Sequence, residues 1–202
     1  DSPNTPYAYT INFSLATGPI TINLDVLTAQ TVQTGQTVTL TNGIENFVGS
    51  TGDDQVTVSA TVTRTVTGNG GSDTLISSDN ASNVWSITDN DAGTLEDIPA
   101  SGTVVSFTGF ANLTGNAGTD TFNFANGKAI TGTINGGDGS DTLDYSLWTS
   151  GVTVDSGKLV SIETLIGGST TDDVIVGVAV SDTFVGTKFV VTGMNAGTAQ
   201  NV

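Results

Sequence analysis

An acidic nine-residue segment recurs along this chain. Its fullest copy is GGDGSDTLD (136–144), which follows the pattern G-x-x-G-x-D-x-(apolar)-x. Three close copies and two partial ones follow the same pattern: GSTGDDQVT (49–57), GNGGSDTLI (68–76), GNAGTDTFN (115–123), GGSTTDDVI (167–175) and GVAVSDTFV (177–185). Glycine permits a tight main-chain turn, and the residues around the apolar position favour a strand. A repeated turn and strand predicts units stacked on one another around one continuous core.

The sixth position of each copy is an aspartate. The chain holds 17 Asp but only 3 Glu, so its acidic residues favour the type that suits turns and hard cations. Asp173 competes with Asp172, because Gly168 and Asp173 stand nine residues before Gly177 and Asp182. Two interpretations remain open for an isolated copy, a cation ligand or an aspartate that only tightens its turn. The sixth-position aspartates are Asp54, Asp73, Asp120, Asp141, Asp172 and Asp182.

The nonapeptide resembles the repeats-in-toxin (haemolysin-type) calcium-binding repeat of secreted bacterial proteins. The resemblance implies that the first six residues turn around Ca²⁺, with main-chain carbonyls and the Asp carboxylate as ligands. It implies several calcium sites along the repeated turns. Their expected residues are Gly49, Asp54, Gly68, Asp73, Gly115, Asp120, Gly136, Asp138, Asp141, Asp172, Asp173 and Asp182. It also implies that the eighth residues point inward, namely Val56, Leu75, Phe122, Leu143, Val174 and Phe184.

The spacing of the copies departs from that family. Two nonapeptides of an uninterrupted array make one coil, so equivalent turns stack about 18 residues apart. Here only Asp54 to Asp73 and Asp120 to Asp141, separated by 19 and 21 residues, match one coil each. Complete calcium sites are therefore expected within these two pairs.

The rest of the chain also predicts strands. Short β-branched runs such as ITINL, TVTL and KFVVT are punctuated by Gly, Asn, Asp and Ser, and no sustained helical spacing of apolar residues occurs. We expect an all-β fold, a right-handed parallel β-helix (a β-solenoid, β-roll-like) of roughly ten coils. No composition shift or Pro-rich linker divides the chain, so residues 1–202 are expected to form a single continuous solenoid, which fits a segment of a longer array.

A longer repeat supports this expectation. LDYSLWTSGVTV (143–154) parallels INFSLATGPITI (11–22), and IETLIGGSTTDDVIV (162–176) parallels IENFVGSTGDDQVTV (44–58). KFVVTGMNAGT (188–198) parallels VWSITDNDAGT (84–94), so a unit of roughly 120 residues recurs with insertions. This order of elements resembles parts of large bacterial surface and filamentous-adhesin proteins, which implies a structural role outside the cell.

Charge and missing residue types narrow the function. The formal charge is −16, with only four basic residues. Such a chain is not expected to bind nucleic acid, and small cations are the expected partners. The chain has no Cys and no His, which excludes disulfides, His-ligated zinc and Ser–His or Cys–His nucleophiles. No apolar run reaches membrane-spanning length. The beginning DSPNTPY, without Met, fits either a processed secreted chain or an excised segment.

Several other segments and residue types allow more than one role. TDNDAGTLED (88–97) is expected to be a solvated loop, because its second copy lacks two of the acids. Trp85 is expected to pack inward or at an edge, whereas Trp148 remains open as a sugar-stacking residue. Thr-rich stretches do not sustain an ice-binding ladder. A carboxylate-only lyase or hydrolase is disfavoured by the scarcity of basic groups.

The sequence therefore predicts a non-enzymatic, calcium-stabilised structural or adhesive solenoid, secreted to the extracellular space or cell surface of a bacterium. One alternative is a self-assembling extracellular filament or sheath subunit. Another is a calcium-binding accessory module of a secreted polysaccharide-active enzyme. The expected partners are calcium ions, neighbouring solenoid segments or subunits docked end to end, and a surface or polysaccharide receptor.

Overall fold

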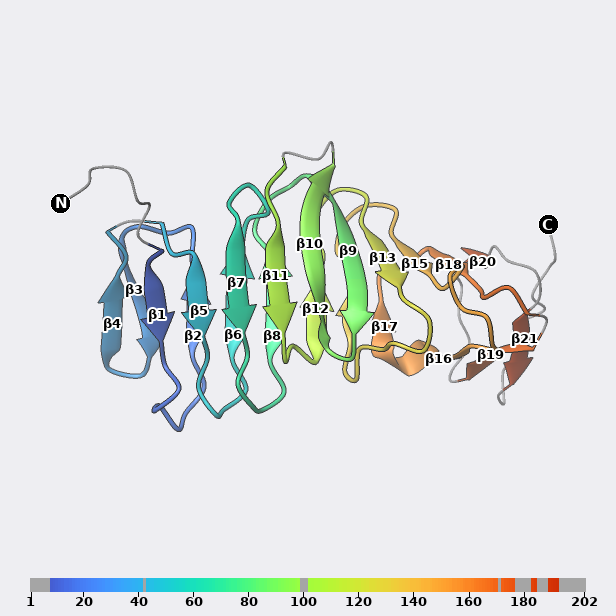
Figure 1. The fold of residues 1–202 in the computed structure, drawn as a ribbon, viewed down its shortest axis with the longest axis horizontal. Helices are drawn as coiled ribbons and strands as arrows, with labels where there is room; N and C mark the ends of the chain where they lie inside the picture. The colour runs from blue at the N-terminus through green and yellow to red at the C-terminus, as the bar shows by residue number, and fades with distance from the viewer. Residues whose placement is uncertain are drawn as a thin grey trace.

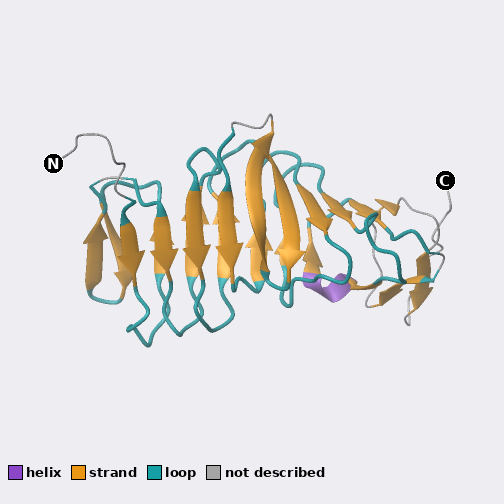
Figure 2. Ribbon diagram, in the orientation of Figure 1, coloured by secondary structure: helices purple, strands orange, loops and turns teal. Residues whose placement is uncertain are grey.

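The computed structural model describes residues 8–41, 43–98, 102–170 and 172–176, together with two later strands at 183–184 and 189–192. In this part of the chain the fold is nearly all-β, as predicted, with one 3₁₀ turn, η1 (Ser156–Lys158) (Figure 2). The described part of the chain is elongated, with strands side by side along its length, the first strands of the chain at one end and the last at the other (Figure 1). No helix among the described residues is long and apolar enough to span a membrane.

The strands are short, as the frequent glycine and asparagine residues between them require. They are β1 (Thr10–Asn12), β2 (Thr21–Asn23), β3 (Ala29–Gln33), β4 (Gln36–Thr39), β5 (Asn46–Val48), β6 (Gln55–Val58), β7 (Arg64–Thr67), β8 (Thr74–Ser77), β9 (Ser82–Asp89), β10 (Ala92–Ile98), β11 (Val105–Thr108), β12 (Asn112–Thr114), β13 (Thr121–Phe124), β14 (Ile134–Asn135), β15 (Thr142–Asp144), β16 (Thr153–Asp155), β17 (Leu159–Val160), β18 (Thr164–Ile166), β19 (Asp173–Val176), β20 (Thr183–Phe184) and β21 (Phe189–Thr192).

These strands form two main sheets and two small ones. A ten-stranded sheet has the order β1-β5-β7-β11-β10-β9-β13-β15-β18-β20, and a six-stranded sheet has the order β17-β14-β12-β8-β6-β2. A three-stranded sheet holds β16-β19-β21, and β3 pairs with β4 as a hairpin. Parallel pairs predominate, but β10 is antiparallel to both of its neighbours and β3 is antiparallel to β4. The sheets are therefore mixed.

The chain alternates between sheets as it advances. In five places a strand of the ten-stranded sheet is followed along the chain by a strand of the six-stranded sheet. These pairs of consecutive strands are β1/β2, β5/β6, β7/β8, β11/β12 and β13/β14. The sets β15/β16, β18/β19 and β20/β21 continue into the three-stranded sheet instead. We call each such set a layer. The in-register parallel pairing of successive layers lines up side chains of like position, for example Ile22 with Val56 and Val56 with Leu75.

The core lies inside these layers. Val56, Leu75, Phe122 and Leu143 are fully buried, as predicted for the eighth position of the nonapeptide. Each such aliphatic or aromatic side chain contributes about 1.5–3 kcal/mol when it is removed from water. Trp85 is also fully buried and stacks on Phe122 with ring centroids 5.6 Å apart, which confirms its predicted inward packing.

An antiparallel pair interrupts the regular succession. After β8 the chain enters β9, which lies beside β13, and β10 returns through the space between β9 and β11. A side chain at position 93 would collide with the main-chain carbonyl of Ser86, which explains the glycine there. This insertion and the layer β11/β12, which contains no aspartate, together account for the long separation between Asp73 and Asp120 in the sequence.

The longer sequence repeat is visible in the strand pairing. Thr10 pairs with Asn46 and Asn46 with Thr65, and the corresponding residues of the second unit pair in the same way, Thr142 with Thr164 and Thr164 with Thr183. The third proposed match, at 188–198, falls largely outside the described residues. Strand β21 within it pairs with β19, as β8 pairs with β6, so it does not occupy the position of β9.

The register of strand β19 in the second unit is shifted by one residue from the predicted alignment. Thr21 pairs with Gln55, but the equivalent Thr153 pairs with Val174, so the turn before β19 contains one extra residue. The predicted inward residue Val174 is therefore only partly buried, and Ile175 takes its place in the core. The side chain of Phe184 lies outside the described residues.

Candidate functional site

Five of the predicted aspartates are buried rather than displayed on the surface. Asp54 is 2% exposed, and Asp73, Asp120, Asp141 and Asp173 are fully buried. We call these five residues the buried aspartates. Asp173, not Asp172, holds the buried position, because of the extra residue in its turn, and Asp172 is exposed. Asp138 is also exposed, on the outside of its turn, and Asp182 lies outside the described residues.

Each buried aspartate accepts a hydrogen bond from the main chain at or just before the neighbouring strand, which belongs to the preceding layer at four positions and is the inserted strand β9 at Asp120. The N–H of Asp54 donates to Oδ1 of Asp73 at 2.8 Å, and the N–H of Asp120 donates to Oδ1 of Asp141 at 2.8 Å. The remaining three acceptors follow the same geometry: Ile20 N–H to Asp54, Asn83 N–H to Asp120 and Val152 N–H to Asp173, at 2.7–2.9 Å. The aspartates therefore connect layers at the entrance to each strand.

Two glutamates extend this arrangement, and the sequence analysis did not assign them a role. The N–H of Asp141 donates to Oε2 of Glu163 at 2.6 Å, and the N–H of Tyr9 donates to Oε2 of Glu45 at the same distance. Both glutamates follow a buried isoleucine in the repeated I-E-(N/T) segment. The recurrence of Glu in this segment, in a chain with three Glu in total, was the available indication.

The second carboxylate oxygen is unbonded at four of the five positions. Oδ2 of Asp73, Asp120, Asp141 and Asp173 is buried and accepts no hydrogen bond of ordinary geometry. Asp54 differs, because its Oδ2 accepts the N–H of Ser50 at 2.6 Å. A buried carboxylate oxygen without a partner is costly, so these four atoms mark positions where a proton or a cation would be stabilising.

A glycine stands five residues before each of the buried aspartates, and four of these five glycines lie against the carboxylate of their own turn. A Cβ atom at Gly136 would collide with Oδ2 of Asp141 and with the carbonyl oxygen of Ser161 in the next layer. Gly49, Gly68 and Gly115 are enclosed in the same way by the Asp of their own turn and the carbonyl oxygen of a glycine in the next layer. The nonapeptide glycine is therefore required because a carboxylate oxygen and a carbonyl oxygen converge beside its Cα.

Burial changes the acidity of these groups. Burial raises the pKa of Asp73 to about 6 from 3.8, with the nearby Asp54 and Asp53 acting in the same direction. Burial likewise raises the pKa of Asp120 to about 6, with Asp141 and Asp79 contributing. The pKa of Asp141 is also raised by burial and by Glu163. The main-chain N–H bonds oppose these effects without cancelling them.

The oxygen atoms beside these glycines could supply some of the ligands of a hard cation. An unbonded carboxylate oxygen and a main-chain carbonyl oxygen from the next layer are the ligand types that Ca²⁺ prefers. Within the described ranges no three acidic side chains are grouped closely enough to hold a metal ion. Main-chain carbonyls would therefore have to supply most of the six to eight oxygens that Ca²⁺ takes. The carbonyls of Gly49 and Ser50 already accept bonds of 3.3 Å from the side chain of Asn69.

The two predicted calcium pairs consequently differ. In the first pair Asp54 has both oxygens bonded, so only Asp73 offers a free atom. In the second pair both Asp120 and Asp141 offer one. Their enclosing glycines, Gly115 and Gly136, are also equivalent. The pair Asp120 and Asp141 is the stronger candidate for a cation.

A buried ion pair lies apart from these aspartates. Arg64 is 3% exposed, and its guanidinium is 2.7 Å from the carboxylate of Asp25. The same guanidinium donates to the carbonyl oxygens of Ile44 and Ser59 at 2.9 and 3.2 Å. The guanidinium of Arg64 is thus held by a carboxylate and by main-chain carbonyls, and it links main-chain segments that are distant in the sequence.

The acidic loop between β9 and β10 is also structural. Asp89 forms an exposed ion pair with Lys128 at 2.8 Å, which lowers the pKa of Asp89. Asp91 accepts bonds from the N–H and the hydroxyl of Thr131 at 2.7 and 2.9 Å. Asp89 is exposed, as predicted for a solvated loop. The contacts of Asp89 with Lys128 and of Asp91 with Thr131, about 40 residues later, were not predicted.

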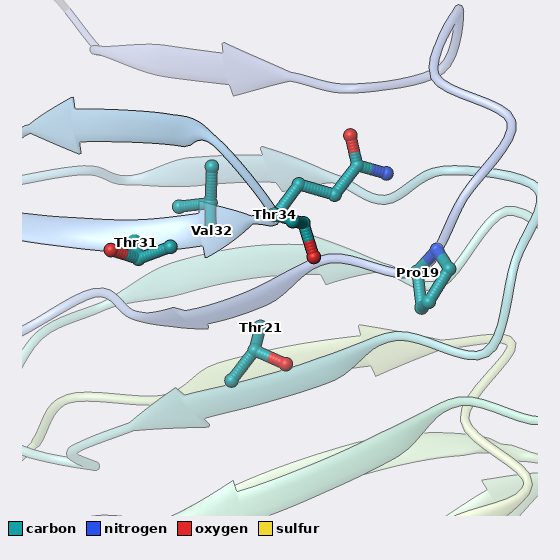
Figure 3. Close-up of a pocket in the computed structure, with 6 residues that line it drawn as sticks. Pro19, Thr21, Thr31, Val32 and Thr34 are labelled. Carbon is teal, nitrogen blue, oxygen red and sulfur yellow. The ribbon is translucent and has the colours of Figure 1, made fainter.

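Two hollows lie in the described part of the chain. The larger, about 430 Å³, lies between β2 and β3 and is lined by Pro19, Thr21, Thr31, Val32, Gln33 and Thr34 (Figure 3). It contains no acidic or basic side chain. The smaller, about 200 Å³, contains Tyr145, Asp155 and Lys158 among mainly apolar residues. Trp148 packs edge-on against Tyr145, with ring centroids 5.5 Å apart. Neither hollow presents an obvious catalytic arrangement.

Comparison with known proteins adds no assignment. No protein-family model, curated protein or solved structure matches this chain.

Proposed function

We propose that this chain is a structural or adhesive segment of an extracellular bacterial surface protein, built as a right-handed parallel β-solenoid and stabilised by Ca²⁺. The observation that carries the proposal is the bond from the N–H of one turn aspartate to the carboxylate of the next, as between Asp120 and Asp141. Such a bond requires the same turn in successive layers to stack in one column. Stacked equivalent turns are the defining feature of a solenoid.

The strand pairing supports the solenoid. The layers advance in one direction with parallel register, and each alternates between sheets before returning beside its predecessor. We take the layers to be the coils, with β9 and β10 as an insertion between two of them. Right-handed connection is the rule for parallel strands joined across a fold. With about 4.8 Å between strands, ten strands give a body on the order of 45 Å long.

The buried oxygens support a cation. Four carboxylates are buried with one free oxygen each, in a chain with a formal charge of −16. Coordination by Ca²⁺ at Asp120 and Asp141 would offset this cost, and a ligand that binds only the folded state stabilises it. We assign Gly115 and Gly136 the role of keeping the space beside these carboxylates free of a side chain.

A structural role fits the residue chemistry better than catalysis. The described acidic side chains are mostly committed, to main-chain N–H groups in the turns, to Arg64 or to Lys128. The chain has no His or Cys to act as a nucleophile or an imidazole base. Repeated layers also suit length and display, because one layer can substitute for another.

Calcium titration and particle shape test the proposal together. We expect heat of Ca²⁺ binding in calorimetry, a higher melting temperature in Ca²⁺ than in chelator, and an elongated particle in small-angle scattering. An Asp120→Asn/Asp141→Asn variant should lose the calcium effect, whereas Asp89→Asn should keep it. Equal melting temperatures in Ca²⁺ and chelator would remove calcium from the proposal. A spherical scattering profile would overturn the solenoid itself.

A further inference from the structure

The hairpin β3–β4 is present in only one of the two repeat units. The connection from β2 to β5 covers residues 24–45, whereas the equivalent connection from β16 to β18 covers residues 156–163 and is 14 residues shorter. The strands on either side correspond in register between the units. The extra residues therefore form an element that the repeated layer itself does not need.

The hairpin provides its own strand partner. In the second unit the short connection contains β17, which pairs with β14 of an earlier layer. In the first unit β3 pairs with β4, the next strand of the same hairpin. The connection of the first unit therefore pairs with itself, whereas the connection of the second unit pairs with a strand of an earlier layer. The hairpin lies next to β1 at one end of the row of described strands (Figure 1).

The side chain of Gln30 also takes the place of a neighbouring strand. Its Oε1 accepts the N–H of Asn23 at 2.9 Å, and its Nε2 donates to the carbonyl of Asn23 at 2.9 Å. Asn23 lies in β2, the last strand of the six-stranded sheet. These two bonds are the ones that a strand added to this edge would make.

The edge of β2 is covered but not fully paired. The N–H of Gln55 donates to the carbonyl of Ile20, so the main-chain groups of Thr21, like those of Asn23, point away from β6. The hollow of about 430 Å³ lies at Thr21, between β2 and the hairpin (Figure 3). Val32 and Leu40 of the hairpin region are 2% and 4% exposed, in the same buried cluster as Ile22. The hairpin is therefore held by these apolar side chains and by Gln30.

We propose that the β3–β4 hairpin is a cap on the edge of β2, which prevents a second copy of this chain from adding its coils to that edge. Open sheet edges template further pairing, and solenoids need atypical terminal elements to remain soluble. This inference rests on the solenoid proposed above. It also argues against growth of a filament by strand pairing at the edge of β2.

Removal of the cap tests the proposal. Deletion of residues 27–40 leaves a connection as long as that of the second unit. In sedimentation velocity we expect the wild-type chain to stay monomeric and the deletion variant to form linear oligomers that grow with concentration. Addition of Thr21→Pro to the deletion should reduce this association at least several-fold, because proline removes the outward N–H.

Point variants keep the test decisive if the deletion variant does not fold. Val32→Asp places a charge in the buried contact of the hairpin, and Gln30→Ala removes the two bonds to Asn23. Both should promote association, while Gln36→Ala at the exposed hairpin tip should not. Folded but monomeric deletion or point variants would overturn the cap and leave the solenoid intact. End-to-end association of the wild-type chain would also overturn it. A compact scattering profile of the wild-type monomer would instead contradict the proposed function.

Discussion

The main-chain N–H of Asp54 donates to the carboxylate of Asp73, one layer further along the chain, at 2.8 Å. The acidic turn is therefore part of the interior of the fold, where its carboxylate satisfies a donor of the previous turn. The same relationship between Asp120 and Asp141 gives the turn a structural use that does not depend on a metal. A cation, if bound, acts on the oxygen that this bond leaves free.

Replacement of Asp141 by alanine should destabilise the protein far more than replacement of Asp89. Asp141→Ala leaves the buried N–H of Asp120 without its acceptor, which costs about 1–3 kcal/mol. Asp89 is exposed and pairs with Lys128 and its neighbouring main chain, so Asp89→Ala should cost much less than Asp141→Ala. Urea unfolding in chelator measures both changes. Equal midpoints for the two variants would mean that the inter-layer bond contributes little.

Replacement of Gly136 by alanine should be destabilising by about 1–3 kcal/mol. The added methyl group would collide with Oδ2 of Asp141 and the carbonyl of Ser161, and the main chain has little room to move because both belong to stacked turns. Gly43→Ala is the matched control, since nothing lies near its Cβ position. Thermal melts of the two variants give the comparison, and a Gly136→Ala melt equal to that of Gly43→Ala would contradict the enclosed geometry.

Stability in chelator should fall as the pH rises from 4 to 7. The pKa of Asp73 and of Asp120 is raised to about 6 in the folded state, against 3.8 when unperturbed. An acid whose pKa is raised by folding stabilises the folded state while it is protonated, and this contribution is lost as the pH passes through its folded pKa. The expected loss is on the order of 1–2 kcal/mol for each group. Unfolding curves at several pH values provide the measurement.

An Asp73→Asn/Asp120→Asn variant serves as the control for this pH effect. It should show a flatter stability profile over the same interval, because the two titrating groups are absent. Saturating Ca²⁺ should reverse the wild-type slope, since the metal binds deprotonated carboxylates. A wild-type profile in chelator that rises towards pH 7 would show that these aspartates are charged at little cost in the folded state.

Repetition explains why much of this fold was predictable. The recurrent apolar eighth position placed Val56, Leu75, Phe122 and Leu143 correctly in the core, because parallel layers in register bury equivalent residues together. The paired sequence units likewise predicted equivalent strands, as in β1–β5 and β15–β18. Local repetition therefore carries information about distant contacts in such a chain.

The remaining features depend on contacts that no local pattern records. The sequence left Asp172 and Asp173 as competing candidates, and the register of β19 with β16 shows that Asp173 holds the buried position. The antiparallel pair β9–β10 and the hairpin β3–β4 were not distinguished from the parallel strands, because their β-forming composition is the same. The burial of the carboxylates also could not be read from a glycine-rich acidic turn, which is usually solvated.

Loss of Asp25 should leave a buried charge without its counter-ion. Arg64 is almost fully buried, while Asp25 retains partial exposure, so Asp25→Ala should cost about 2–3 kcal/mol through the unpaired guanidinium. Asp138→Ala is the control, because that aspartate is exposed on its turn. The double variant Arg64→Met/Asp25→Ala should be more stable than the sum of the single changes predicts, since it removes both charges together. Denaturant unfolding of the wild type, Asp25→Ala, Arg64→Met and the double variant completes this double-mutant cycle. Strict additivity would show that the carbonyl bonds of Arg64, rather than its pairing with Asp25, hold these layers together.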